Sequence, residues 1–280
     1  MDSINSVVTG ANSGIGLETA RALAKRGDRV FLLCRSREKA VEAAQKIAVP
    51  GGIDPVIVIG DLSCFEDVER MAKEVLATTS TIEVLVNNAG GYFPERTLSP
   101  NGVEMNLALN HLAYFGLTHR LLPALNQNAR VVNVASRAHR TADLRMDDLE
   151  FVKRRYRAFV AYGTSKLMNI LFTRGFARRF PDGPRMNAVH PGVVKTGFGH
   201  DYPGIFSWLA KCASPFMVSP AKGAETSIFL ATGRTVEGLT GGYYSDCKLT
   251  TPRKAAQDEE MANQLWSASE DLCGFEFGQY

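Results

Sequence analysis

The chain has 280 residues, of which 45% are hydrophobic and 22% are charged, with 25 glycines and 12 prolines. These values are typical of a globular protein and exclude a collagen-like repeat, a disulfide scaffold and a wholly disordered chain. The length suits one α/β domain, or at most one and a half. The net charge of +3 arises from 32 basic and 29 acidic residues spread along the chain, so we expect no nucleic-acid partner.

The five cysteines are widely spaced and include no C-x-x-C pair. The sequence therefore predicts neither a disulfide framework nor a metal site, and we expect reduced thiols. The first residues lack the basic and apolar regions of a signal peptide. No run approaches the roughly eighteen apolar residues of a membrane-spanning helix. These features predict a cytoplasmic protein without a transmembrane segment.

Short apolar runs alternate with stretches of helical period along the chain. In chain order we expect a strand at 6–9, a helix at 14–26, a strand at 29–34, a helix at 37–47, a strand at 56–60, a helix at 65–77, a strand at 82–87, a helix at 103–125, a strand at 129–135, a helix at 161–180 and a strand at 185–190. Most of these strands are continuously apolar, as in a parallel sheet that is buried on both faces. The alternation predicts an α/β fold, a doubly wound parallel sheet in three αβα layers, as a single domain over residues 1–280.

Two segments interrupt this alternation. Residues 137–157 are strongly charged, and we expect a short helix near 146–153 inside them; this segment is equally well explained as a solvated surface insertion. Residues 197–220 combine aromatic side chains with glycine and proline. Because long loops above a parallel sheet commonly carry binding sites, we predict that this second segment is a lid over an apolar substrate.

A glycine-rich turn follows the first strand. Gly10, Gly14 and Gly16 allow the backbone to turn sharply and to approach a ligand closely. The helix expected directly afterwards offers free N–H groups and the positive end of its dipole to a pyrophosphate. Because the turn lies between a strand and a helix, the motif predicts dinucleotide binding.

The residues after the second strand indicate which dinucleotide is bound. A carboxylate at this position holds the ribose hydroxyls of NAD, whereas an arginine accommodates the extra phosphate of NADP. The chain has Arg35, Ser36 and Arg37 there, and no carboxylate. We therefore predict NADP(H), bound through Arg35 and Ser36. Arg37 is explained equally well as a second phosphate contact or as an exposed residue at a helix start.

Small and amide residues follow the third and fourth strands. Asn88, Ala89 and Gly90 suit a wall against the adenine and ribose of a nucleotide. Asp61 is placed to bond the adenine amino group, with Leu62 beside it. An N-cap role explains Asp61 equally well, and Leu62 then simply packs in the core.

Tyr162 and Lys166 lie one turn apart on the same face of an expected helix. A phenol with a pKa near ~10 is a poor base at neutral pH unless a cation favours the phenolate. The Lys166 ammonium group can supply that charge. Tyr162 could then exchange a proton with a carbonyl oxygen while hydride moves to or from a nicotinamide.

The order of these motifs resembles the short-chain dehydrogenase/reductase family over essentially the whole chain, which implies a Rossmann fold. The resemblance implies that Tyr162 is the acid/base and that Ser136 bonds the substrate oxygen. It also implies that Lys166 holds the nicotinamide ribose and that Asn110 fixes a water molecule beside Lys166. The cofactor-binding residues that it implies are Gly10, Asn12, Ser13, Gly14, Ile15, Gly16, Arg35, Ser36, Asp61, Leu62, Asn88, Ala89, Gly90, Tyr162, Lys166, Pro191, Gly192, Val193 and Thr196.

Within the family, several passages are similar to the retinol dehydrogenase branch, including residues 32–35, 110–115 and 244–247. This resemblance implies an NADP(H)-dependent enzyme that interconverts a lipophilic aldehyde or ketone and its alcohol. Two alternatives stay open: a sugar-nucleotide epimerase or dehydratase, and an NADP-binding regulatory protein without turnover. The family often pairs subunits through the helices that start near 103 and 161, so homodimers and homotetramers are both compatible with the sequence.

Overall fold

The computed structural model describes residues 4–192 and 218–278, in which eight strands form one sheet in the order β3-β2-β1-β4-β5-β6-β7-β8. Strands β1 to β7 are parallel, whereas β8 pairs antiparallel to β7. The strands are β1 (Asn5–Thr9), β2 (Arg29–Cys34), β3 (Val56–Ile59), β4 (Ile82–Asn87), β5 (Leu125–Val134), β6 (Arg185–His190), β7 (Tyr243–Ser245) and β8 (Lys248–Leu249). The predicted doubly wound sheet is thus confirmed, with one antiparallel strand added at its edge.

Neighbouring residues of β1 show why the strand sequences are continuously apolar. Val7 belongs to the core on one face of the sheet, which also contains Val68 and Phe115. Val8 packs in the core on the opposite face, beside Leu23. Because successive side chains of a strand point to opposite faces, a sheet covered on both sides needs apolar residues at both positions.

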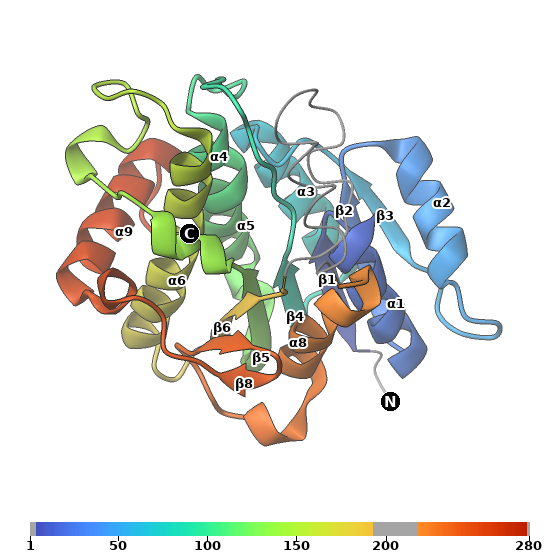
Figure 1. Ribbon diagram of the computed structural model, residues 1–280. Helices are drawn as coiled ribbons and strands as arrows, with labels where there is room; N and C mark the ends of the chain where they lie inside the picture. The colour runs from blue at the N-terminus through green and yellow to red at the C-terminus, as the bar shows by residue number, and fades with distance from the viewer. Residues whose placement is uncertain (1–3, 193–217, 279–280) are drawn as a thin grey trace.

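Helices cover both faces of this sheet (Figure 1). On one face lie α1 (Gly14–Arg26), α2 (Arg37–Ile47) and α8 (Pro220–Thr232), which share one apolar core. On the other lie α3 (Phe65–Thr78), α5 (Ala113–Leu121), α6 (Ala158–Arg179) and α9 (Glu259–Cys273), which share another. This arrangement confirms the three αβα layers expected from the sequence.

The helix expected at 103–125 is interrupted in the structure. It consists of α4 (Met105–Leu107), a π-helical turn at Ala108–Leu112 and α5. Strand β5 then begins at Leu125, four residues before the predicted start, and its residues 126–128 are polar and exposed. Leu125 pairs with Ile82 of β4, and the register then shifts before Arg130 pairs with Val84, so these three exposed residues lie in an irregularity of the strand that apolar periodicity does not reveal.

The helix expected near 146–153 is reduced to a single 3₁₀ turn at Met146–Asp148. One oxygen of the Asp148 carboxylate accepts hydrogen bonds from the backbone N–H of Val152 at 2.7 Å and of Lys153 at 3.1 Å. These two N–H groups are therefore not available to continue a helix. Phe151, directly before Val152, has a φ of 55°, in the left-handed region, which also ends the turn.

The helices that the family resemblance offers for subunit pairing are covered within the chain itself. Residues 113–119 of α5 and 163–173 of α6 are all buried. The ring of Trp266 from α9 lies 5.1 Å from Phe115 and 5.8 Å from Phe172, measured between ring centroids. These parts of α5 and α6 are therefore packed against other elements of the same chain.

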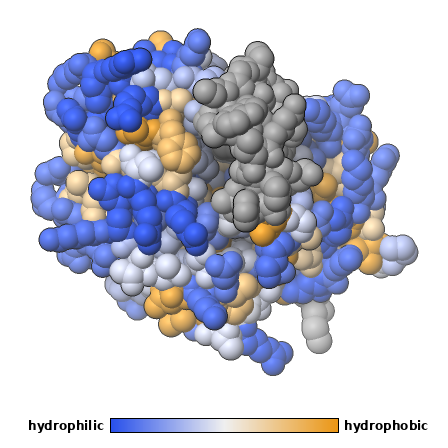
Figure 2. All heavy atoms as spheres, in the orientation of Figure 1, coloured by the Kyte–Doolittle hydropathy of each residue, from blue (hydrophilic) through white to orange (hydrophobic). Residues whose placement is uncertain are grey.

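The surface shows how the remaining apolar residues are distributed. On the face drawn in Figure 2, hydrophilic residues predominate and apolar residues form several separate areas among them. Within residues 4–192 and 218–278, none of the helices combines the length and the apolar character needed to cross a bilayer.

The four cysteines of the same residues are free thiols, as expected.

Candidate active site

The carboxyl ends of β1 and β4 meet where the strand order of the sheet turns back, which is where doubly wound sheets bind ligands. The Thr9 hydroxyl accepts hydrogen bonds from the backbone N–H of Asn88 at 2.8 Å and of Ala89 at 2.9 Å. The Asn88 side chain donates to the Thr9 carbonyl at 2.8 Å. Asn88 and Ala89 are therefore held beside the glycine turn that follows β1.

The glycine turn has the conformation and the close contacts that glycine alone permits. Gly10 and Gly14 have φ values of 63° and 56°, in the left-handed region. A Cβ atom at Gly16 would lie 2.4 Å from the Gly10 carbonyl oxygen and 2.5 Å from the Asn88 amide nitrogen. Helix α1 can approach the turn this closely only because residue 16 is glycine.

Uncommitted N–H groups are present at the start of α1. The first-turn N–H groups of Gly14, Ile15 and Gly16 have no acceptor inside the helix. Ser13, at the N-cap position, makes no side-chain capping hydrogen bond within the described residues. The donors and the helix dipole therefore fit an anionic group such as a pyrophosphate.

The backbone N–H groups of Ala11 and Asn12, which precede these donors, bond the Cys34 thiol. Burial raises the pKa of that thiol to about 11, and the two hydrogen bonds only partly oppose this. The thiol at the end of β2 is thus a neutral group that orders the glycine turn.

The end of β2 presents the residues expected to select the cofactor. The Arg35 side chain is 76% exposed, and its guanidinium lies 4.0 Å from the Asp61 carboxylate. Ser36 caps α2, since its hydroxyl accepts a hydrogen bond from the Lys39 N–H at 3.3 Å. Arg35, predicted to bind the 2′-phosphate, and Asp61, predicted to bond the adenine amino group, thus lie next to each other.

The alternative N-cap role of Asp61 is wrong, because the N-cap of α3 is Cys64. The Asp61 carboxylate instead accepts hydrogen bonds from the backbone N–H and the hydroxyl of Ser63, at 2.9 Å and 2.8 Å. The Leu62 side chain is buried in the same apolar core as Val68. Only its backbone remains available for the predicted cofactor contact.

The candidate catalytic residues converge at the ends of β5 and α6. Tyr162 and Lys166 lie in α6, and Ser136 is the second residue after β5. The Ser136 hydroxyl forms a hydrogen bond with the Tyr162 phenol. A Cβ atom at Gly163 would lie 2.5 Å from the Ala138 carbonyl oxygen, so glycine at this position lets α6 approach the Ser136 turn.

Two histidines hold the Ser136 turn in place. His190, at the end of β6, accepts a hydrogen bond at 3.1 Å from the Arg137 N–H through its Nδ1 atom. The His139 Nδ1 lies 2.7 Å from the Ser136 carbonyl oxygen, and its Nε2 accepts from the Arg253 N–H at 3.2 Å. The sequence alone did not assign His139, because its partners lie in distant segments.

Lys166 is buried, with 3% of its surface exposed. Its Nζ atom donates to the Val134 carbonyl at 3.0 Å and lies 5.8 Å from the centre of the Tyr162 ring. Burial lowers the pKa of Lys166 to about 7. Burial also raises the pKa of Tyr162 to about 12, and the Ser136 hydrogen bond only partly opposes this. The sequence predicts that Lys166 lowers the pKa of Tyr162. With these side chains alone, the pKa is instead raised.

Asn110 lies in the π-helical turn and is fixed by four contacts. Its carbonyl oxygen accepts from the Gly91 N–H at 2.8 Å, and its amide nitrogen lies 2.9 Å from the Gly91 carbonyl oxygen. The same nitrogen lies 3.1 Å from the Ser165 hydroxyl and 3.3 Å from the Asn106 side-chain oxygen. A Cβ atom at Gly90 would lie 2.8 Å from Asn110 Oδ1, so Gly90 leaves room for this amide. Single-turn π-helices are frequent at functional sites.

Two further tyrosines border the catalytic pair, and the sequence did not point to them. The Tyr92 ring packs edge-on against Tyr162, with 6.0 Å between the ring centroids. The buried Tyr114 ring lies 5.5 Å from the Lys166 Nζ atom. Tyr92 lies in the loop after β4 and Tyr114 lies in α5, and both are placed by packing against α6. No local sequence pattern predicts this packing.

The remaining predicted contacts follow β6. Pro191 and Gly192 continue directly from the strand, and Gly192 has a φ of 86°. Val193, Thr196 and the lid up to residue 217 lie outside the described residues. The lid prediction extended too far at its end, because Pro220 is the first residue of α8.

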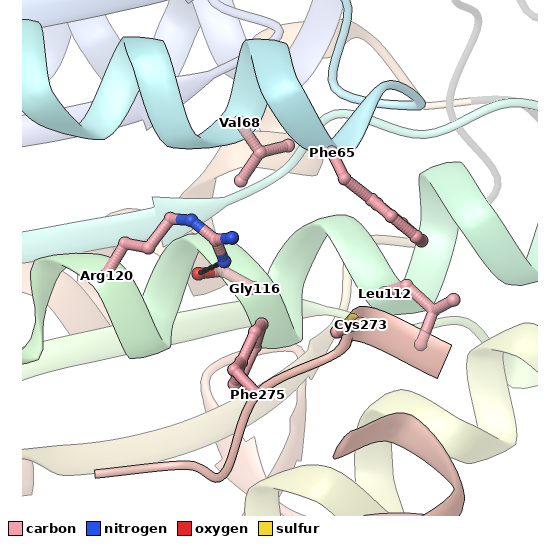
Figure 3. Close-up of a pocket in the computed structure, with 7 residues that line it drawn as sticks. All are labelled: Phe65, Val68, Leu112, Gly116, Arg120, Cys273 and Phe275. Carbon is pink, nitrogen blue, oxygen red and sulfur yellow. Dashed lines mark hydrogen bonds between the residues drawn. The ribbon is translucent and has the colours of Figure 1, made fainter. Parts of the chain in front are cut away.

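A separate small cavity lies between α3, α5 and the C-terminal segment (Figure 3). Its lining includes Phe65, Arg120, Cys273 and Phe275, and the Arg120 guanidinium donates to the Gly116 carbonyl. Its volume of about 10 Å³ holds no more than one water molecule. This cavity is therefore not a substrate site.

The sheet, with the glycine turn at the reversal of its strand order, is a Rossmann fold. The fold and the retinol dehydrogenase relatives together define an oxidoreductase that acts on CH–OH groups. The family model described as short chain dehydrogenase matches residues 5–203, and the chain belongs to this family. It falls in the retinol dehydrogenase-like branch, as the resemblance implied.

Curated relatives and solved structures agree with this assignment. The chain is 40% identical to "Retinol dehydrogenase 12" of Homo sapiens over 272 residues, covering 96% of this chain and 85% of the relative. It is similar to the crystal structure of a putative uncharacterized protein from Mycobacterium paratuberculosis, with a TM-score of 0.81, 32% identity and 99% and 95% of the two chains covered. It is also similar to an actinorhodin polyketide ketoreductase with NADPH, with a TM-score of 0.68, 25% identity and 88% and 96% covered.

Proposed function

We propose that this protein is an NADP(H)-dependent oxidoreductase that interconverts a lipophilic aldehyde or ketone and its alcohol, with Tyr162 as the acid/base. The observation that carries the proposal is the Tyr162 phenol, hydrogen-bonded to Ser136 and one helical turn from the buried Lys166. Neither a purely structural turn nor a cofactor-binding regulator needs a buried lysine at this position. The retinol dehydrogenase relatives support the class of reaction.

The residues present fit a nicotinamide dinucleotide. The uncommitted N–H groups of residues 14–16 suit its pyrophosphate, and the close approach at Gly16 keeps that surface free of side chains. Arg35 is exposed at the end of β2, where a 2′-phosphate is bound in this kind of fold. When bound, the cofactor supplies or accepts the hydride.

The chain's own residues account for the proton. In the direction of reduction, the Tyr162 phenol donates its proton to the carbonyl oxygen, and Ser136 donates a hydrogen bond to the same oxygen. A phenol whose pKa is raised to about 12 is fully protonated at neutral pH and is therefore ready to act as the acid. The Val134 carbonyl holds the Lys166 Nζ atom 5.8 Å from the centre of the Tyr162 ring. When Lys166 is protonated, its charge favours the phenolate that forms after Tyr162 has donated its proton.

The lipophilic character of the substrate rests on two supports. The relatives are named for retinol, a long apolar alcohol. Residues 197–217 contain Phe206, Trp208, Phe216 and Met217, which suit contact with an apolar molecule.

The experiment that tests the proposal is a spectrophotometric assay of NADPH and NADH oxidation against a panel of lipophilic aldehydes and ketones. We expect Tyr162→Phe to lower kcat by roughly 10²–10⁴-fold, the usual contribution of a positioned acid. Tyr244→Phe, a buried tyrosine in β7, is the matched control and should retain activity. Equal kcat values for wild type and Tyr162→Phe would refute the role of the phenol.

A further inference from the structure

A buried carboxylate lies outside the catalytic cluster. Glu104 is 1% exposed, and none of the arginines or lysines in the described chain forms an ion pair with it. A buried carboxylate is costly unless hydrogen bonds compensate the lost hydration. Here they do: Oε1 accepts from the Asn106 N–H at 3.0 Å and from the Asn106 side chain at 2.8 Å. Oε2 accepts from the Leu107 N–H at 2.9 Å.

These hydrogen bonds lead from Glu104 to Asn110. The Asn106 amide nitrogen has two hydrogens, which it donates to Glu104 and to the Tyr156 hydroxyl, both at 2.8 Å. The orientation of the Asn106 amide is thereby determined, and its oxygen faces Asn110 Nδ2 at 3.3 Å. Glu104 also caps α4, the short helix that leads into the π-helical turn carrying Asn110.

Tyr156 connects the charged segment 137–157 to this network. Its hydroxyl lies 2.8 Å from the Phe93 carbonyl oxygen, next to Tyr92, whose ring packs against Tyr162. The same segment contributes the Glu150 carboxylate, which accepts from the Glu104 N–H at 3.1 Å. Helix α4 packs against α6, which carries Tyr162 (Figure 1). The segment therefore acts on the site through α4 and does not only cover the surface.

We infer that Glu104, Asn106 and Tyr156 are positioning residues that hold Asn110 in the geometry in which it fixes a water molecule beside Lys166, the neighbour of the Tyr162 phenol. The inference rests on the proposed function. The Ser165 hydroxyl accepts from Asn110 and donates to the Tyr162 carbonyl at 2.8 Å, so a displacement of Asn110 reaches the helix turn that carries the phenol. The Asn110 amide is also bonded to Gly91, so loss of the network shifts Asn110 without removing it.

The test uses Tyr156→Phe and Glu104→Gln, with Tyr244→Phe as the control for a buried hydroxyl. We expect each of the two network variants to lower kcat by roughly tenfold, because small displacements of reacting groups have large effects on rate. The KM for the carbonyl and the dissociation constant for NADPH should stay within about twofold, since the network touches neither the glycine turn nor Arg35. The solvent deuterium isotope effect on kcat should rise as proton transfer becomes slower.

A second measurement does not depend on activity. In the cofactor-free protein, the side-chain NH₂ signals of Asn110 in a ¹H–¹⁵N spectrum should shift in Tyr156→Phe and in Glu104→Gln but not in Tyr244→Phe. Unchanged Asn110 signals with unchanged kcat and isotope effect would overturn the inference. A parallel loss of kcat, NADPH affinity and thermal stability would also overturn it, because the network would then be merely structural. An inactive wild type with shifted Asn110 signals would instead refute the proposed function alone.

Discussion

Arg35 offers a direct test of cofactor choice. The change is Arg35→Asp, which replaces the exposed guanidinium at the end of β2 with a carboxylate. The new side chain would lie near Asp61, whose carboxylate is 4.0 Å from the Arg35 guanidinium. The variant thus removes a donor for a 2′-phosphate and places a second negative charge where that phosphate would bind.

The expected magnitude follows from the exposure of the side chain. A hydrogen bond to a charged group contributes about 1.5–3 kcal/mol, and about 1.4 kcal/mol corresponds to a tenfold change in affinity. Because the Arg35 side chain is 76% exposed, solvent screening favours the lower end of this range. The added repulsion acts in the same direction. We therefore expect NADPH to bind more than about tenfold more weakly to Arg35→Asp.

The assay is a fluorescence or calorimetric titration with NADPH and NADH at fixed ionic strength. NADH has no 2′-phosphate, so its dissociation constant should change by less than about threefold. Lys39→Asp, an identical charge change at an exposed residue of α2, controls for a general electrostatic effect. An equal loss of NADPH and NADH affinity in Arg35→Asp, or no loss at all, would refute the reasoning.

Two further predictions concern the glycine turn and the phenol. Gly16→Ala should lower the free energy of unfolding by about 1–3 kcal/mol and weaken NADPH binding, because its Cβ would lie 2.4 Å from the Gly10 carbonyl oxygen. Urea unfolding checks this, with Gly175→Ala in α6 as the control, where the nearest atom is 3.5 Å away; equal stabilities of the two variants would contradict the steric argument. Because burial raises the pKa of Tyr162 to about 12, the phenol should stay protonated in cofactor-free protein as the pH rises through 10. A ¹³C NMR titration of the tyrosine Cζ signals, assigned with Tyr162→Phe, measures this; Ser136→Ala should raise the pKa further, and ionisation of Tyr162 below pH 10 would contradict the effect of burial.

The local patterns of the chain were sufficient for much of the fold and of the candidate site. Strand–helix alternation, the glycine turn and the four-residue spacing of Tyr162 and Lys166 are properties of short windows, so periodicity and spacing predict them. The bounds of β2, β4, β6, α1 and α2 agree with those predictions. The prediction at 146–153 was wrong because the Asp148 carboxylate, and not helix propensity, determines the conformation there.

Contacts between distant segments decided the rest. The Val134 carbonyl that holds Lys166, the Thr9 hydroxyl that binds the loop after β4, and the Tyr156 hydroxyl beside Asn106 join residues far apart in the chain. The pKa of Tyr162 likewise depends on burial by several elements at once. The sequence by itself thus determined which residues could do the chemistry. Only the tertiary structure decided how they are held and charged, because desolvation and hydrogen-bond partners arise when separate elements pack together.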